Sequence, residues 1–129
     1  MSVEVFNKLI GRTMRSVTRS IGNGSDVVVF ELDDGQKWFM YHPQDCCEYV
    51  ALEEVIGYLS DLEDSPIRMA EVVSSVDGNN EWTFYKFRTD KGDVTFRWCG
   101  DLLSYYSIEV TFGPNTSTTW IPCEIRDLV

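Results

Sequence analysis

The sequence has no run of apolar residues approaching the roughly 20 that a helix needs to cross a bilayer. The first 16 residues, MSVEVFNKLIGRTMRS, also lack the basic segment and continuous apolar stretch of a secretory signal. These two absences predict a cytoplasmic protein with no membrane partner.

Cationic residues are scarce. Eleven Lys and Arg stand against 21 Asp and Glu, so the net charge is −10 at pH 7. Long-range repulsion would oppose an encounter with a nucleic acid polymer or an anionic membrane, so we expect neither as a partner. An anionic ligand would have to be small and held by a few local cations.

Disulfide and metal signatures are missing as well. The four cysteines fit no secreted disulfide framework, so we expect reduced, mostly buried thiols. They are Cys46, Cys47, Cys99 and Cys123.

One segment could still suggest a zinc site or a thiol nucleophile, because His42, the only histidine, stands near Asp45, Cys46 and Cys47. Structural zinc needs four ligands in recognisable pairs, and a nucleophile needs a device that stabilises an oxyanion. Neither pattern is complete, so we predict no metal site, no cofactor, no catalytic residue and no enzymatic activity.

What is present indicates a folded protein. The composition is 43% hydrophobic and 13% aromatic, without repeats, and 129 residues suffice for one core. We predict a single domain over residues 1–129, in which 114–129 is a C-terminal tail that packs on the body or on a neighbouring subunit.

The periodicity predicts an α+β fold, mainly antiparallel sheet with two hairpins and one or two short helices. Apolar spacing predicts helices over 3–10 and over 52–63, the second from Val55, Ile56, Leu59 and Leu62. Alternation and turn residues predict strands at 13–19, 67–75 and 105–112, and hairpins at 26–42, around Asp34-Gly35, and at 81–100.

The hairpin at 81–100 carries the clearest chemical pattern. With Lys91 and Gly92 in the turn, Phe87 faces Phe96 and Tyr85 faces Trp98, which gives an apolar face toward the core. The opposite face is then mixed aromatic and cationic; it comprises Trp82, Phe84, Lys86, Arg88 and Arg97.

In this register Lys86 lies directly opposite Arg97, which is unfavourable unless an acid or a bound anion neutralises the pair. Aromatic rings beside Arg and Lys suit a nucleotide, because bases stack on rings and phosphates accept charge-assisted hydrogen bonds. The alternative is a solvated face with Glu81 or Glu109 as counter-ions.

Two hydroxyl-bearing residues could join this face. If the strand at 105–112 pairs with residues 96–100, Tyr105 and Ser107 point outward beside Arg97, while Tyr106, Ile108 and the later apolar residues point inward. Their hydroxyls could then bond a ribose or a phosphate. An exposed face rich in hydroxyls is the simpler alternative.

An acidic series accompanies the predicted helix at 52–63. It could be a solvated face or a surface that mimics DNA and occupies a basic host protein, which gives a second functional hypothesis, an acidic protein-binding inhibitor. Its members are Glu48, Glu53, Glu54, Asp61, Glu63 and Asp64.

Two short motifs stand out, QDCCE (44–48) and WTFYKF (82–87). They lie within a longer series of segments, which runs from the first hairpin through HPQDCCEYVALEEVIGYLSDLEDSPI and AEV to the second hairpin and then YYS. Over about residues 25–112 this order resembles a family of small phage and prophage proteins described as a domain of unknown function. The chain is also similar to the phage anti-Thoeris sponges. One departure is Leu103-Ser104-Tyr105-Tyr106-Ser107, where that family often has Gly-Tyr-Tyr-Ser.

That resemblance implies an anti-defence function in the cytoplasm of a host cell. Such sponges bind cyclic ADP-ribose isomers made by bacterial TIR enzymes, some bind cyclic oligonucleotides, and they assemble as oligomers that do not cleave the ligand. By this resemblance the chain sequesters a small cyclic nucleotide as a homo-oligomer, with the aromatic Phe84 in its WTFY word at the ligand.

Overall fold

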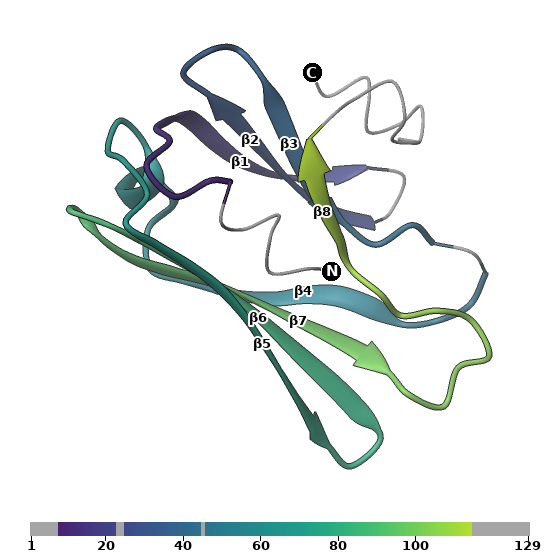
Figure 1. Cartoon of the computed structure of the whole chain (residues 1–129). Coiled ribbons are helices and arrows are strands. Elements are labelled where there is room, and N and C mark those ends of the chain that lie inside the picture. The colour runs from purple at the N-terminus through teal and green to yellow at the C-terminus, as the bar shows by residue number, and fades with distance from the viewer. Residues whose placement is uncertain (1–7, 23–24, 45, 115–129) are drawn as a thin grey trace.

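The computed structural model describes residues 8–22, 25–44 and 46–114, and these form two antiparallel four-stranded sheets (Figure 1). The first sheet has the order β1-β2-β3-β8 and the second the order β4-β7-β6-β5. The elements are β1 (Met14–Gly22), β2 (Ser25–Leu32), β3 (Lys37–Tyr41), β4 (Val50–Ile56), the 3₁₀ turn η1 (Leu59–Leu62), β5 (Met69–Asp77), β6 (Asn80–Thr89), β7 (Gly92–Asp101) and β8 (Thr111–Pro114).

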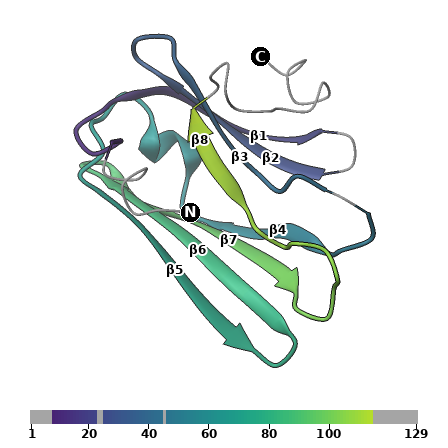
Figure 2. The same ribbon diagram turned by 45° about the vertical axis from the view of Figure 1, so that its right-hand side comes forward.

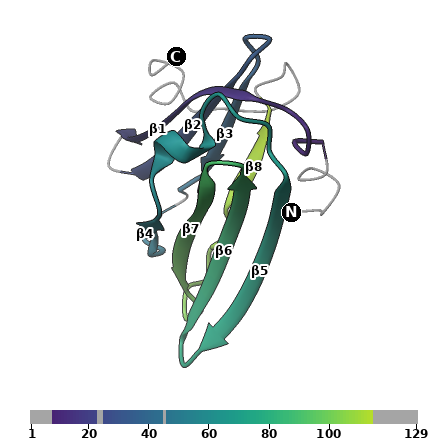
Figure 3. The same ribbon diagram turned by 90° about the vertical axis from the view of Figure 1, so that its left-hand side faces the viewer.

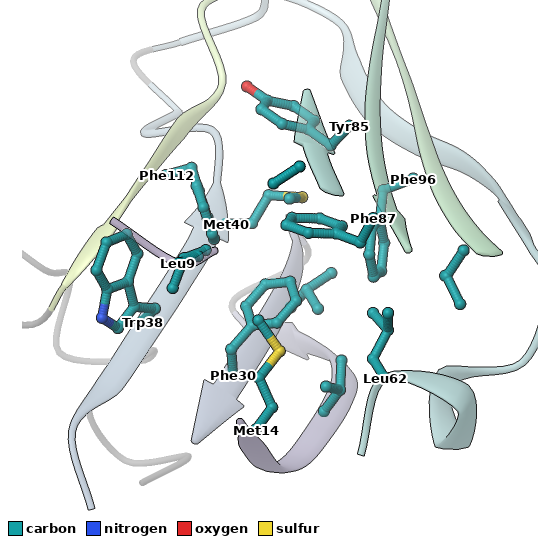
Figure 4. Packing of buried hydrophobic residues seen from close by; sticks show 14 of the residues in the cluster. Leu9, Met14, Phe30, Trp38, Met40, Leu62, Tyr85, Phe87, Phe96 and Phe112 are labelled. Carbon is teal, nitrogen blue, oxygen red and sulfur yellow. The ribbon is translucent and has the colours of Figure 1, made fainter. Parts of the chain in front are cut away.

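Alternating apolar residues on facing strands build the core between the sheets. The Phe30 ring of β2 lies 5.3 Å from the Phe112 ring and 5.7 Å from the Phe96 ring, both edge-on (Figure 4). Phe87 lies 5.8 Å from Phe96. Trp98 is also almost completely buried, and its indole N–H points at the sulfur of Met40 on the opposite sheet. One cluster of buried side chains therefore joins both sheets.

The α+β prediction is wrong: the described part of the chain is antiparallel β, and its helical structure is the single 3₁₀ turn. The predicted helix over 52–63 is β4 followed by η1. The apolar spacing behind the prediction crosses two elements, because Val55 and Ile56 end β4 while Leu59 and Leu62 belong to η1. The chain turns between them at Gly57, which has a φ of +101° that a helix does not allow.

The other predicted helix, over 3–10, falls partly on residues outside the described ranges, and its described part forms turns. The early strand and the first hairpin are confirmed. Gly35 takes a φ of +87° in the turn between β2 and β3, as the Asp34-Gly35 pair predicts. Of the predicted tail, only Pro114 is described, as the last residue of β8; 115–129 lie outside the described residues.

The last predicted strand is mostly absent. Residues 102–110 form turns and irregular chain, and the strand that follows, β8, pairs with β3 (Figure 2). It cannot pair with β7 as predicted, because β7 already has β4 on one side and β6 on the other. Of the residues expected to point inward, Val110 and Phe112 are buried, whereas 42% of Tyr106 is exposed.

The β5–β6 hairpin is long, and its turn projects beyond the first sheet (Figures 1 and 3). Side chains on β5 are mostly exposed from Glu71 onward. No helix in the described ranges is long and apolar enough to cross a membrane.

Candidate ligand-binding face

Five of the seven predicted site residues lie together on the outer face of the second sheet. The turn of the β6–β7 hairpin is Asp90-Lys91, because Thr89 pairs with Gly92. The register therefore differs by two residues from the predicted one. A shift of two preserves the faces of a sheet, so the division into an inner apolar face and an outer mixed face holds. The five are Trp82, Phe84, Lys86, Arg88 and Arg97.

The register does remove the expected like-charge pair. Lys86 is opposite Thr95, and Arg97 is opposite Phe84. The predicted pairing of Lys86 with Arg97 is therefore wrong, and neither an acid nor a bound anion is needed to neutralise it.

Arg97 stands at the centre of this face. Its guanidinium carbon is 4.1 Å from the centroid of the Trp82 ring, and its Nη1 donates to Glu54 Oε1 at 2.9 Å. About a third of its side chain is exposed. Trp82 and Phe84 are both half-buried. The arrangement fixes a guanidinium plane on an aromatic ring, with a second ring directly across the strand pair.

The other two cations also have acidic partners. Lys86 Nζ is 3.9 Å from Glu71 Oε1, and Arg88 Nε donates to Asp93 Oδ1 at 2.8 Å. That hydrogen bond is the main reason that the pKa of Arg88 is raised. These partners are not the predicted Glu81 and Glu109. An incoming phosphate must compete with a carboxylate for each cation, and such solvent-exposed ion pairs add little to the stability of the fold.

Tyr105 and Ser107 lie elsewhere. Tyr105 is fully exposed in the segment after β7. It borders a cavity of about 220 Å³ that Cys47, Glu48 and Tyr49 also line. Ser107 borders a different cavity, and its Oγ accepts the backbone N–H of Glu109 at 3.2 Å. The structure therefore does not join these two residues to the Arg97 face.

The cavity beside Ser107 has a volume of about 360 Å³ and is lined by residues of β5, β6 and the segment before β8. Its described lining combines Glu81 and Glu109 with hydroxyl and apolar side chains and contains no Lys or Arg. Tyr85 forms part of its wall, and burial, with a smaller contribution from Glu109, raises the pKa of the Tyr85 phenol. Such a lining disfavours a phosphate, so this cavity is a poorer candidate for an anionic ligand than the outer face.

The histidine and the vicinal cysteines do not form a nucleophilic pair. Both ring nitrogens of His42 are engaged, Nε2 with Glu48 Oε2 at 2.8 Å and Nδ1 with the Glu109 carbonyl at 2.6 Å. Cys46 and Cys47 are exposed, contrary to the expectation of buried thiols, whereas Cys99 is buried. The adjacent Cys46 side chain is the main cause of a raised Cys47 pKa, which disfavours the nucleophilic thiolate.

Within the described residues, no three His, Cys, Asp or Glu side chains are arranged to hold a metal ion. Cys123 lies outside the described ranges.

The acidic series is dispersed, because the helix that would have aligned it is absent. Glu48 is buried against His42, and Glu63 accepts the Val17 backbone N–H at 2.9 Å. Glu53 accepts the Tyr49 hydroxyl. Sequence reasoning missed the internal roles of Glu48 and Glu63, and it missed Glu54 as the partner of Arg97. Nothing in the sequence signals these contacts, since each joins segments that only the fold brings together.

Comparison with known proteins gives one result. No curated protein and no solved structure matches the chain significantly. A family described as a domain of unknown function (DUF7448) matches residues 7–112, most of the chain and including every described strand except part of β8. The protein therefore belongs to the DUF7448 family.

Proposed function

We propose that this protein is a non-enzymatic binding protein that captures a small cyclic nucleotide on the outer face of the second sheet. The observation that carries the proposal is the stacking of the Arg97 guanidinium on Trp82, opposite the half-buried Phe84. Aromatic and guanidinium planes attract nucleobases, and the same guanidinium bonds phosphate oxygens. The resemblance to anti-Thoeris sponges supports the nucleotide class and an anti-defence role.

In this proposal a base stacks on Phe84 or on the exposed part of Arg97. Phosphate oxygens take over the hydrogen bonds that Arg97 makes with Glu54 and the weaker ion pair of Lys86 with Glu71. This exchange of partners is feasible because both ion pairs are partly exposed to solvent, and exposed ion pairs contribute little to the stability of the fold. Arg88, near the turn, adds positive potential.

No chemistry on the ligand is required. Sequestration depends on equilibrium affinity and needs no group that stabilises a transition state. The ligand should therefore leave the protein unchanged.

We further propose that the functional form is a homo-oligomer. The outer face exposes 42% of Val73 and 50% of Ile56 beside the two half-buried aromatic residues. Apolar side chains gathered on one sheet face are typical of a protein interface. A second copy over this face would exclude water from the nucleotide and strengthen its contacts with Arg97.

The alternative function, an acidic inhibitor or DNA mimic directed at a host protein, depends on the net charge of −10. The dispersal of the acidic series gives it less support than a continuous acidic helix would. If no nucleotide binds, we expect the protein to act as such an acidic inhibitor.

Isothermal titration calorimetry against cyclic ADP-ribose isomers and cyclic di- and trinucleotides tests the proposal. We expect at least one of them to bind, to stabilise the fold by about 2.7 kcal/mol at 100 times its dissociation constant, and to be recovered intact. Absence of binding by the whole set would overturn the proposal.

A further inference from the structure

The inner face of the β5–β6 hairpin changes from apolar to polar toward the hairpin turn. Phe87 and Tyr85 of β6 are 0% and 2% exposed and belong to the core that joins the two sheets. The next positions of β6 on the same face are Thr83 and Glu81, because side chains alternate along a strand. Ser74 of β5 pairs with Thr83 and shares this face. Polar side chains therefore continue the inner face where the packed rings end.

This polar end of the inner face forms one wall of the cavity of about 360 Å³, and residues 107–110 form the other. Contacts with the body of the protein hold the second wall in place. The Glu109 carbonyl lies 2.6 Å from Nδ1 of the buried His42, and the Tyr85 hydroxyl donates to the Val110 carbonyl at 3.4 Å. The cavity is therefore fixed by the fold on both sides.

A buried polar group closes the end of the cavity nearest the core. Tyr85 lines the cavity, and its phenol oxygen points away from the Phe87 ring (Figure 4). Burial, and to a smaller extent the charge of Glu109, raises the pKa of this phenol, so it stays protonated. A protonated phenol both donates and accepts hydrogen bonds.

The charge that lines the cavity is negative on both walls. Glu81 comes from the hairpin and Glu109 from the segment before β8, and the described lining contains no Lys or Arg. The net charge of −10 adds a negative potential that draws cations toward the protein. A cation between the two walls would be attracted by both carboxylates. The electrostatics that disfavour a phosphate here therefore favour a cationic ligand.

The rest of the lining favours an organic cation. Val72, Ile108 and Val110 supply apolar surface, which an aliphatic chain can cover and a bare metal ion cannot use. Ammonium N–H groups donate to carboxylates and hydroxyls, and both kinds of acceptor line the cavity. Its volume is within the range of about 300–1,000 Å³ that is usual for small-molecule sites.

We propose that this cavity binds a small aliphatic amine, whose ammonium groups are held by Glu81 and Glu109. The site is distinct from the Arg97 face, because the cavity lies on the inner side of the second sheet and Arg97 on the outer side. The inference does not depend on nucleotide binding.

A nuclear magnetic resonance titration of the full chain with 1,4-diaminobutane tests the proposal. We expect saturable shifts of the backbone amides at residues 72–74, 81–85 and 107–110. The matched control ligand is 1,4-butanediol, which has the same carbon chain without charge and should not shift these amides at the same concentration. Absence of shifts with the diamine, or equal shifts with the diol, would overturn the proposal.

Two isosteric variants test the role of the carboxylates. Glu81→Gln and Glu109→Gln keep the shape of each side chain and remove its charge, and each should weaken diamine binding by at least about tenfold. Glu31→Gln is the matched control, since it changes the net charge equally but lies on β2, where Glu31 pairs with Arg15 at 3.7 Å. It should bind as tightly as the original chain. Unchanged affinity in both cavity variants, or an equal loss in Glu31→Gln, would show that the amine does not use this cavity.

Discussion

His42 and Glu48 form a buried pair in which Nε2 and Oε2 are 2.8 Å apart. His42 Nδ1 faces the Glu109 carbonyl, which can only accept, so Nδ1 carries a hydrogen. A carboxylate also only accepts, so a further proton must lie between Nε2 and Oε2. The two contacts of His42 tie the end of β3 to the segment that precedes β4, through Glu48, and to the segment that precedes β8, through Glu109.

Removing the carboxylate should therefore destabilise the fold. Glu48→Ala leaves a buried imidazole and the Cys46 backbone N–H without Glu48, and we expect a loss of about 3 to 5 kcal/mol in the free energy of unfolding. Glu48→Gln is the matched control: its amide can donate to Nε2 of neutral His42 and accept from Cys46, so it should lose only about 1 kcal/mol. Urea unfolding measures both. Equal losses would refute the shared-proton arrangement.

Nucleotide affinity should depend on Arg97 and Phe84. We expect Arg97→Ala to weaken binding by about 1.5 to 3 kcal/mol and Phe84→Ala by about 1 to 3 kcal/mol, measured by calorimetry. Arg97→Lys should recover only part of the loss, because lysine cannot stack on Trp82 as a plane.

The matched control for these variants is Arg15→Ala. Arg15 is an exposed arginine on the first sheet, with an ion pair to Glu31 at 3.7 Å, and its loss should leave affinity unchanged. If Arg97→Ala binds as tightly as the original chain, the ligand does not use this face.

Glu53 should control the ionisation of Tyr49. The hydrogen bond from the Tyr49 hydroxyl to Glu53 is the main reason that the pKa of Tyr49 rises to about 12. Glu53→Ala should return it toward 10, the ordinary value, as followed by ultraviolet difference spectra. Nucleotide affinity should not change.

The sign of the pH effect on stability follows from that raised pKa. The folded state holds the phenolic proton more tightly than the unfolded state does, so the contribution of Tyr49 to stability is fully present below pH 10. It should decline as the pH rises toward about 12. A Tyr49 that titrates with the same pKa in the Glu53→Ala variant would contradict this account.

Gly57 should tolerate no side chain. Its φ is +101°, and a Cβ there would lie 2.3 Å from the Asp93 carbonyl oxygen. We expect Gly57→Ala to lower the free energy of unfolding by more than about 3 kcal/mol, since backbone strain and a backbone clash add. Gly78, at φ +63° with open space around it, is the control, and Gly78→Ala should lose only about 1 kcal/mol. Thermal or urea unfolding of the two variants would show the difference, and similar losses would argue against the close approach of β4 and β7.

Assembly should depend on the outer face of the second sheet. Light scattering at micromolar concentration should give at least a dimer, and Val73→Asp should shift it toward monomer because a charge cannot be buried there without a partner. Thr18→Asp, at an exposed strand position of β1 on the first sheet, tests whether charge alone has this effect. A monomeric original chain would remove the closed-site part of the proposal.

The sequence by itself determined the local strand pattern. Asp34-Gly35 predicted a hairpin because few residue pairs accept its backbone angles, and alternation in residues 81–100 placed Arg97, Trp82 and Phe84 on one outer face despite a register error of two residues. Local rules suffice for such features, because turn chemistry and side-chain alternation depend on residues that are neighbours in the chain.

Only the tertiary structure decided the rest. Val55, Ile56, Leu59 and Leu62 have a spacing close to that of a helix, and only the pairing of Val55 and Ile56 with β7 shows that a strand ends there before the 3₁₀ turn begins. Because β7 already pairs with β4 and β6, β8 pairs with β3 in the other sheet. Tyr105 and Ser107 therefore lie apart from Arg97 and border two different cavities. Glu54 became the partner of Arg97, and Glu48 the partner of His42, through pairings and loop closures. Contacts of this kind depend on which distant segments compete for the same strand edge, and that competition is settled by the packing of the whole core.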